Sequence, residues 1–352
     1  MTASFTYEIN PGRVLFGPGA IEAVAGEIAR LGAKRALILS TPSQQADAQK
    51  LAAQIGPLAA GVFSEAAMHT PVAVTLEAMA AYEAARADCV VALGGGSTIG
   101  LGKAIAWRNN AAQIVVATTY AGSEVTPILG QTEDGVKTTI RDAKILPEVV
   151  IYDPALTLGL PVEMSVTSGL NAIAHAVEGV YARDRNPVTS LTAAEGVRAL
   201  RDALRVIVTR PDDLAARSDA LYGSWLCGSV LGTVGMSLHH KLCHTLGGSF
   251  DLPHAQTHAI VLPHSAAYNA QAAAQELRPL ADLFGGSIGG GLYDFARSLG
   301  APLALKDLGL KESQLDAAAD LAVKNPYWNP RPVEREAVRA LLQRAWEGAR
   351  PE

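Results

Sequence analysis

The stretch Cys89–Trp107, CVVALGGGSTIGLGKAIAW, decides the fold class. Its apolar run Cys89–Leu93 is typical of a buried parallel strand, and three glycines lead directly into the helical pattern Ser97–Trp107. A strand that passes straight into a helix is one unit of a doubly wound sheet. The same alternation recurs along the first half of the chain. Further strands are predicted at Arg35–Ser40, Ile114–Thr118 and Val149–Asp153, and helices at Ala20–Leu31, Gln44–Ile55 and Val72–Ala87.

The two ends of the chain have different patterns. The β-rich runs Phe5–Ile9 and Arg13–Phe16 flank Asn10-Pro11-Gly12 and predict a hairpin. After Leu160-Pro161 strand-like runs are scarce, and Gly285–Gly291 is interpreted as a loop. Long helical patterns cover Ser165–Ala182, Pro187–Val208, Asp212–Met236, Ser237–Leu246, Ser265–Leu283 and Glu334–Gly348. We therefore predict an α/β nucleotide-binding domain with a doubly wound parallel sheet over residues 1–160, and an all-α substrate and catalytic domain over residues 161–352.

Composition excludes several classes of protein. The 352 residues carry a net charge of −5, whereas a nucleic-acid-binding protein usually has a concentrated basic surface. No apolar run approaches the roughly 20 residues of a membrane span, and the N-terminus lacks a signal-peptide pattern. The three cysteines are too few and too scattered for a disulfide scaffold, so we expect a cytoplasmic protein.

Two loops at the carboxyl ends of predicted strands are candidate cofactor-binding segments. In the first, Gly94, Gly95 and Gly96 let the backbone approach a phosphate, and Ser97 is placed to cap the following helix. The second contains Thr118, Thr119, Tyr120 and Ser123. A glycine triplet alone is equally compatible with a tight turn that binds nothing. Two such loops on one sheet edge favour a dinucleotide site.

The turn after the first parallel strand bears on which dinucleotide is used. Ser40 and Thr41 are expected to lie near the adenosine ribose, and this turn contains no acidic residue. A carboxylate there would hold the ribose hydroxyls and repel a 2′-phosphate. Its absence predicts that NADPH is accepted beside NADH.

Histidine is distributed unevenly. Six of the eight histidines lie between His239 and His264. His240 and His244 are four residues apart, so they share one face of a helix, and His254 follows after two glycines. Asn171 and His175 have the same spacing on another helix. Converging imidazoles of this kind suit a zinc or iron site, although a single helical histidine is more often a surface or core residue.

These motifs resemble the iron-containing alcohol dehydrogenase superfamily over nearly the whole chain, and within it the maleylacetate reductase family. The matching stretches are Phe16–Gly19, Met68–Thr75, Gly94–Ala106, Thr118–Ile128, Tyr152–Pro154, Gly169–Glu178, His239–Ala259 and Asn325–Pro332. The resemblance also implies that Lys137 reaches the cofactor, and that the protein is a homodimer. A solvent-exposed strand lysine is the alternative for Lys137.

The sequence departs from the superfamily at three positions. Metal-dependent members use one aspartate and three histidines as ligands, and the resemblance aligns these with Asn171, His175, His240 and His254. A neutral amide cancels none of the charge of a divalent cation, so we expect no metal ion here. Gly100 and Thr41 also stand where the superfamily usually has acids.

The resemblance implies reduction of the carbon–carbon double bond of 2-maleylacetate, a small dicarboxylate, to 3-oxoadipate in the degradation of aromatic compounds. It makes His175, His240, His244 and His254 the expected catalytic residues. The expected substrate-binding residues are Asn171, His239, Lys241, Tyr120 and Tyr327. The leading alternative is a metal-dependent alcohol or glycerol dehydrogenase of the same superfamily. A dehydroquinate synthase-like lyase and a metal-binding protein without catalysis are less well supported, because basic residues are few and the two loops would be unexplained.

Overall fold

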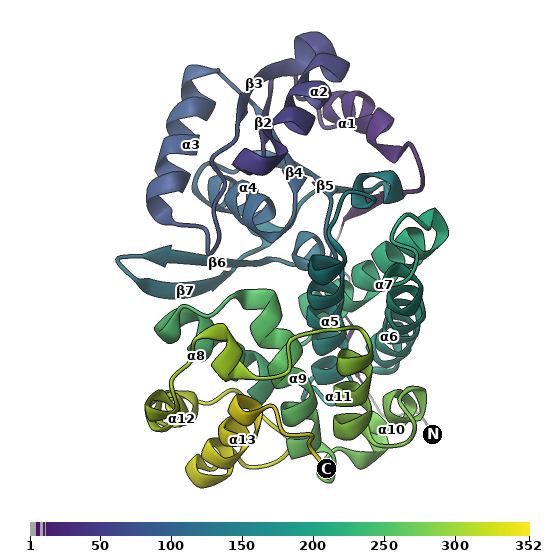
Figure 1. The fold of residues 1–352 in the computed structure, drawn as a ribbon. Helices are drawn as coiled ribbons and strands as arrows, with labels where there is room; N and C mark the ends of the chain where they lie inside the picture. Colours follow the sequence, from purple (N-terminus) through teal and green to yellow (C-terminus); the bar gives the residue numbers. More distant parts are fainter. Residues whose placement is uncertain (1–4, 8–9, 11) are drawn as a thin grey trace. The chain divides into compact units, whose positions relative to one another are not determined.

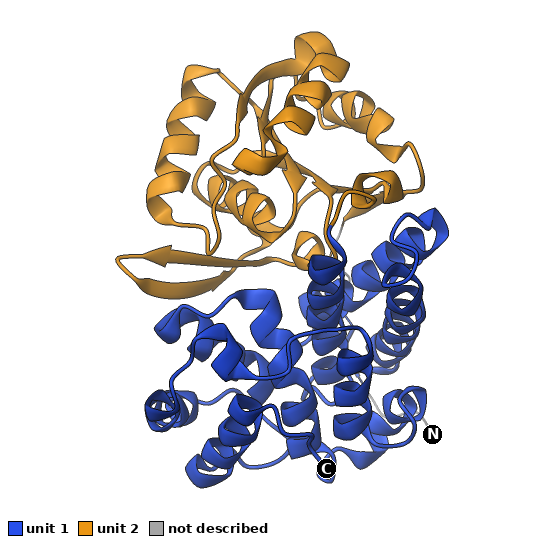
Figure 2. Ribbon diagram, viewed as in Figure 1, with its two compact units in different colours: residues 1–8, 161–352 blue, residues 9–160 orange. Residues whose placement is uncertain are grey.

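The computed structural model describes residues 5–7, 10 and 12–352. It divides into two compact units (Figure 2). One, the α/β unit, spans Ile9–Leu160. The other, the helical unit, comprises Pro161–Glu352 and is grouped with the stretch Met1–Glu8.

The α/β unit contains a six-stranded sheet in which every strand pair is parallel. The strand order is β1-β8-β5-β4-β2-β3. The strands are β1 (Arg13–Phe16), β2 (Ala36–Leu39), β3 (Ala59–Phe63), β4 (Cys89–Gly94), β5 (Ala112–Ala117) and β8 (Val149–Tyr152). The doubly wound parallel sheet predicted for this half is confirmed.

Helices cover both faces of this sheet (Figure 1). They are α1 (Val24–Arg30), α2 (Gln45–Ile55), α3 (Val72–Ala84) and α4 (Gly96–Asn109). On β2, Ile38 packs in one apolar cluster with α1 and α2, whereas Leu37 and Leu39 pack with α3 and α4. Because both faces are covered, the central strands are continuous apolar runs rather than alternating ones.

Three features of this unit differ from the sequence prediction. Arg13–Phe16 pairs in parallel with β8, and the other half of the expected hairpin, Phe5–Ile9, lies partly outside the described residues. Strand β3 was not predicted, because Gly61 interrupts a weak apolar run. The antiparallel pair β6 (Ile128–Glu133) and β7 (Val136–Arg141) was also missed, since its strands are polar.

The helical unit consists of α-helices and short 3₁₀ turns among the described residues. Its helix α5 (Val162–Gly179) packs against α7 and α9, and α8 packs against α9. The remaining helices are α6 (Pro187–Ile207), α7 (Leu214–Thr233), α8 (Leu238–Phe250), α9 (His254–Asn269), α10 (Ala274–Leu283), α11 (Ile288–Ser298), α12 (Leu315–Val323) and α13 (Arg335–Glu347). No helix of the described chain is long and apolar enough to cross a membrane.

Two predictions for the helical unit are wrong in detail. The pattern Ser265–Leu283 is two helices, and the first of them begins at His254. The predicted loop Gly285–Gly291 contains the start of α11. A β-carbon on Gly289 would lie 2.5 Å from that of Ala267 on α9, so glycine here permits close packing of two helices.

Candidate active site

Three helices of the helical unit bring the histidines together. His175 lies on α5, His239, His240 and His244 on α8, and His254 and His258 on α9. The ring centroid of His258 is 4.4 Å from that of His254 and 5.2 Å from that of His240. On α8 and α9, the four-residue spacings His240–His244 and His254–His258 place the two members of each pair on one face. We call these six residues the histidine cluster.

A buried carboxylate anchors one branch of the histidine cluster. The Oε2 atom of Glu178 lies 2.7 Å from Nδ1 of His240, and Nε2 of His240 lies 2.9 Å from Nδ1 of His175. All three side chains are buried. Glu178 was not among the residues predicted from the sequence, because a glutamate near the end of a helix is usually solvent-exposed. Its only sequence signal is the three-residue spacing from His175.

The second branch is a hydrogen-bonded pair of imidazoles with no exposed surface. The Ser265 hydroxyl donates to the Leu262 carbonyl (3.0 Å), so it accepts from Nδ1 of His239 (3.0 Å). Nε2 of His239 then accepts from Nδ1 of His258 (2.9 Å). This leaves a lone pair on Nε2 of His258, which is buried without a partner among the described residues. Burial, reinforced by the neighbouring histidines, lowers the pKa of both imidazoles well below its usual value, so both stay neutral.

The more accessible edge of the cluster contains a histidine and a phenol. Nδ1 of His244 lies 3.2 Å from the hydroxyl of Tyr327, and both side chains are half-buried. The ammonium of Lys241 lies 5.8 Å from the centre of the Tyr327 ring. Burial raises the pKa of Tyr327 and lowers that of Lys241. His254 is also half-buried. The accessible edge of the cluster therefore contains two imidazoles and a phenol as proton donors, together with the cation of Lys241.

The donor set does not fit the metal ion of the superfamily. Asn171 is one turn before His175 on α5, and its Oδ1 is buried without a partner among the described residues. Within the described chain, the group of histidine, cysteine or carboxylate atoms close enough to share an ion is His239, Cys243 and His258, not His175, His240 and His254. The amide at position 171 brings no negative charge.

The predicted cofactor loops of the α/β unit are packed against one another. Gly94 has φ +155°, and a β-carbon there would lie 2.5 Å from Oγ1 of Thr98. A β-carbon on Gly95 would lie 2.6 Å from Cγ2 of Thr119. Gly96, the first residue of α4, has open space around it. The loop thus leaves the first N–H groups of a helix accessible to a phosphate, which fits a dinucleotide.

Side chains of the neighbouring turn connect to the second loop. Thr118 accepts a hydrogen bond from the Gln44 amide (3.0 Å), and Thr41 is 3.0 Å from the Ser43 hydroxyl. Ser40 is fully buried and donates to Ser64 (2.9 Å). The turn after β2 therefore presents Thr41 rather than Ser40.

Lys103 ties α4 to the segment that follows the second loop. Its ammonium lies within hydrogen-bonding distance of five oxygens of Ser123, Thr126 and Ile128, among them the carbonyls of Thr126 (2.8 Å) and Ile128 (2.9 Å). Lys103 has no exposed surface, and burial lowers its pKa to about 7, opposed by the charge of Glu124. Lys103 was not among the residues predicted from the sequence.

Four residues of the α/β unit have surroundings that the sequence did not reveal. Ser97 is inside α4, and the residue that precedes the helix is Gly95, so the predicted serine cap is wrong. Tyr120 is fully buried, and Lys137 is half-buried on β7. Gly100 faces the hydroxyl of Thr70, and a β-carbon at this position would clash with that hydroxyl unless Thr70 moved.

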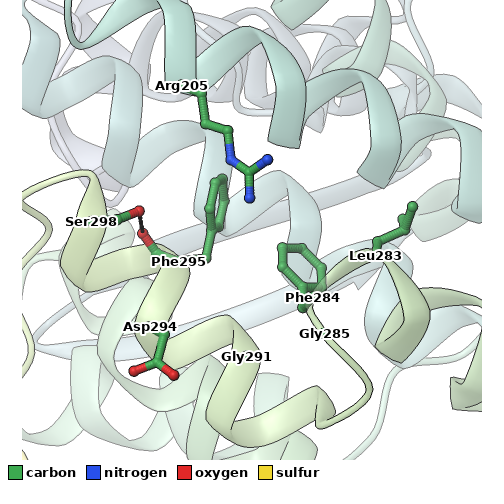
Figure 3. Close-up of a pocket in the computed structure, with 8 residues that line it drawn as sticks. All are labelled: Arg205, Leu283, Phe284, Gly285, Gly291, Asp294, Phe295 and Ser298. Carbon is green, nitrogen blue, oxygen red and sulfur yellow. Dashed lines mark hydrogen bonds between the residues drawn. The ribbon is translucent and has the colours of Figure 1, made fainter.

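A pocket elsewhere in the helical unit is separate from the histidine cluster. It lies among α6, α10 and α11, and Figure 3 shows Arg205 and Phe295 beside it. The Arg205 guanidinium is 5.6 Å from the centre of the Phe295 ring. None of its lining residues belongs to the candidate active site.

Comparison with known proteins agrees with this arrangement. The iron-containing alcohol dehydrogenase model matches residues 11–154, and the C-terminal model of the Fe-containing alcohol dehydrogenase family matches residues 165–346. The maleylacetate reductase of Rhizobium sp. (strain MTP-10005) is 67% identical over 348 residues, 99% of each chain.

Two solved structures extend the comparison. The maleylacetate reductase of Agrobacterium tumefaciens shares 65% identity, with a TM-score of 0.96 over 99% of this chain and 100% of the other. An iron-containing alcohol dehydrogenase of Corynebacterium glutamicum shares 41% identity, with a TM-score of 0.94 over 100% of this chain and 99% of the other. The chain therefore belongs to the iron-containing alcohol dehydrogenase family and, within it, to the maleylacetate reductases.

Proposed function

We propose that this chain is an oxidoreductase that reduces 2-maleylacetate to 3-oxoadipate with NADH or NADPH. The observation that carries the proposal is the histidine cluster, with Lys241 and Tyr327 at its accessible edge. The substrate is a dianion, which needs cationic and hydroxyl partners. We infer the substrate from the 67% identity with a maleylacetate reductase over 99% of the chain.

The residues of the α/β unit supply the cofactor site. Gly94, Gly95, Gly96 and Ser97 would hold the pyrophosphate at the start of α4, and Thr118, Thr119, Ser123 and Lys137 complete the site in this proposal. When bound, the dinucleotide supplies the hydride that adds to the alkene carbon β to the ketone. Thr41 would lie near the ribose, and its uncharged side chain would not repel a 2′-phosphate.

The helical unit supplies the remaining chemistry. Hydride addition places negative charge on the ketone oxygen, and Lys241 and Tyr327 stabilise that enolate while they hold a carboxylate. A histidine of the cluster then donates a proton to the carbon α to the ketone. His244 is the best placed, because it is half-buried and shares a hydrogen bond with Tyr327. Stabilisation of the enolate and transfer of the proton use this chain's own residues, so we propose that no metal ion is required.

The decisive experiment measures oxidation of NADH by the purified protein with 2-maleylacetate, and identifies the product. Formation of 3-oxoadipate is expected, and it should be unchanged by a chelator. Failure to convert 2-maleylacetate would overturn the proposal. Activity on simple alcohols that needed added Fe²⁺ or Zn²⁺ would favour a metal-dependent alcohol dehydrogenase instead. The predicted homodimer and cytoplasmic location belong to the same proposal, and light scattering tests the first of them.

A further inference from the structure

We infer that Glu178 is a positioning residue of this reaction. Its carboxylate fixes the tautomer of His240 and also the start of the helix that carries His240 and His244. The inference rests on the proposed function, since it assigns these histidines to catalysis. Glu178 itself is fully buried on α5, so it acts through other residues.

The hydrogen bonds of Glu178 account for both carboxylate oxygens. Oε1 accepts from the backbone N–H of His239 (2.7 Å), and Oε2 accepts from that of Ser237 (2.8 Å). Oε2 also lies 2.7 Å from Nδ1 of His240. Because an ionised carboxylate oxygen can only accept, Nδ1 of His240 is the donor in this contact and carries a proton.

The tautomer of His240 determines that of the next imidazole. With its proton on Nδ1, His240 presents a lone pair at Nε2, which faces Nδ1 of His175 at 2.9 Å. That contact is a hydrogen bond when His175 donates, so the proton of His175 also lies on Nδ1. One buried carboxylate thus orients two rings of the histidine cluster, as the third member of a catalytic triad orients its histidine.

Glu178 has a second effect on the same residues through the backbone. Helix α8 begins at Leu238, and its preceding residue, Ser237, makes no side-chain cap. The carboxylate from α5 binds the N–H groups of Ser237 and His239 in its place, and a negative charge there is favourable. The direction of α8, and with it the position of His244, is therefore set by Glu178.

The test compares Glu178→Gln with Glu163→Gln, a matched change on the exposed first turn of the same helix. The amide keeps the size of the side chain but replaces one acceptor with a donor, so either a backbone N–H or His240 loses its partner. We expect kcat with 2-maleylacetate to fall about 100-fold in Glu178→Gln, as expected for loss of an orienting group, and KM for NADH to change less than about threefold. Glu163→Gln should match the unsubstituted enzyme. A fall in kcat of less than tenfold in a folded Glu178→Gln protein would overturn the inference.

A measurement on the unsubstituted protein tests the same inference without substrate, and a variant serves only to assign a signal. Nitrogen-15 NMR of histidine-labelled protein distinguishes an imidazole protonated at Nδ1 from one protonated at Nε2, and a His240→Gln sample assigns the signal. The Nδ1–H tautomer is expected for His240, and an Nε2–H tautomer would refute the role of Glu178. The NMR measurement involves no turnover, so it tests the role of Glu178 whatever the outcome of the maleylacetate assay. The maleylacetate assay, in turn, tests the proposed function.

Discussion

Nδ1 of His244 lies 3.2 Å from the phenol of Tyr327, so residues 83 positions apart in the sequence share one hydrogen bond at the accessible edge of the histidine cluster. A proton donor needs such access to its substrate, whereas His175 and His240 are buried deeper. The pair is therefore the first target for substitution.

Replacement of His244 by alanine should reduce kcat by at least about 100-fold, the usual effect of losing a general acid. Tyr327→Phe removes only the hydroxyl, and its effect should be smaller. If the two act together, the double variant will lose less than the product of the two single losses, as steady-state kinetics would show. Near-normal turnover of His244→Ala would remove this residue from the catalytic set. Circular dichroism of each variant controls for folding.

Thr41 should control the choice between NADH and NADPH. Thr41→Asp places a carboxylate at the turn after β2, where it would repel a 2′-phosphate. We expect kcat/KM for NADPH to fall at least about tenfold and that for NADH to change little. Thr41→Asn, similar in shape but uncharged, is the control. The unsubstituted enzyme should turn over with both dinucleotides, and negligible turnover with NADPH would contradict the prediction.

Chelation should leave the activity intact. Asn171 contributes no charge, and the ring nitrogens of His175 and His240 already bond to one another at 2.9 Å. We expect the same kcat/KM after dialysis against EDTA and no gain on addition of Fe²⁺ or Zn²⁺. Asn171→Asp supplies the missing carboxylate, so this variant should retain more zinc in elemental analysis. Loss of activity on chelation would show that the amide suffices to hold a catalytic ion.

Acid should destabilise the helical unit through His264. Burial, reinforced by the positive charge of Arg344, lowers the pKa of His264 to about 4, whereas an unfolded histidine titrates near 6.5. Between these values the unfolded chain binds a proton that the folded chain does not, so stability falls as the pH falls from 6.5 to 4. For His264 the loss amounts to roughly 3 kcal/mol.

Urea unfolding at pH 7 and pH 4.5 tests this directly. The free energy of unfolding of His264→Leu should fall less between the two pH values than that of the unsubstituted protein, by roughly 2 to 3 kcal/mol. His239 and His258 are shifted in the same direction, so the variant keeps some acid sensitivity. Equal losses in the two proteins would exclude a neutral buried His264.

The fold was predictable where local pattern and tertiary environment agree. The runs Cys89–Leu93 and Ile114–Thr118 have helices on both faces. Such strands are apolar on both sides, so a continuous apolar run predicts them directly. Strands β6 and β7 were not predictable in this way, because they form a polar two-stranded sheet outside the main one. Their turn, Asp134-Gly135, was the one available signal.

In the candidate site, too, the sequence predicted which side chains share a helix face, but not which side chains are buried or contact distant residues. The four-residue spacing of His240 and His244 predicts a shared face, and the structure places their rings 6.1 Å apart. Glu178 and Lys103 could not be selected, because their importance lies in burial and in contacts with distant backbone groups. His239 was predicted to bind the substrate, yet its imidazole is fully buried and lies against the hydroxyl of Ser265.

Lys103 limits how the α/β unit can be redesigned. The carbonyls of Ser123, Thr126 and Ile128 converge on one ammonium group, so an insertion or deletion in this segment would turn an acceptor away from a buried amine. A buried polar group that loses its partners destabilises a protein by about 1 to 3 kcal/mol or more. Engineers who wish to change the coenzyme should therefore diversify the turn at Thr41 and keep the length of the Ser123–Ile128 segment fixed.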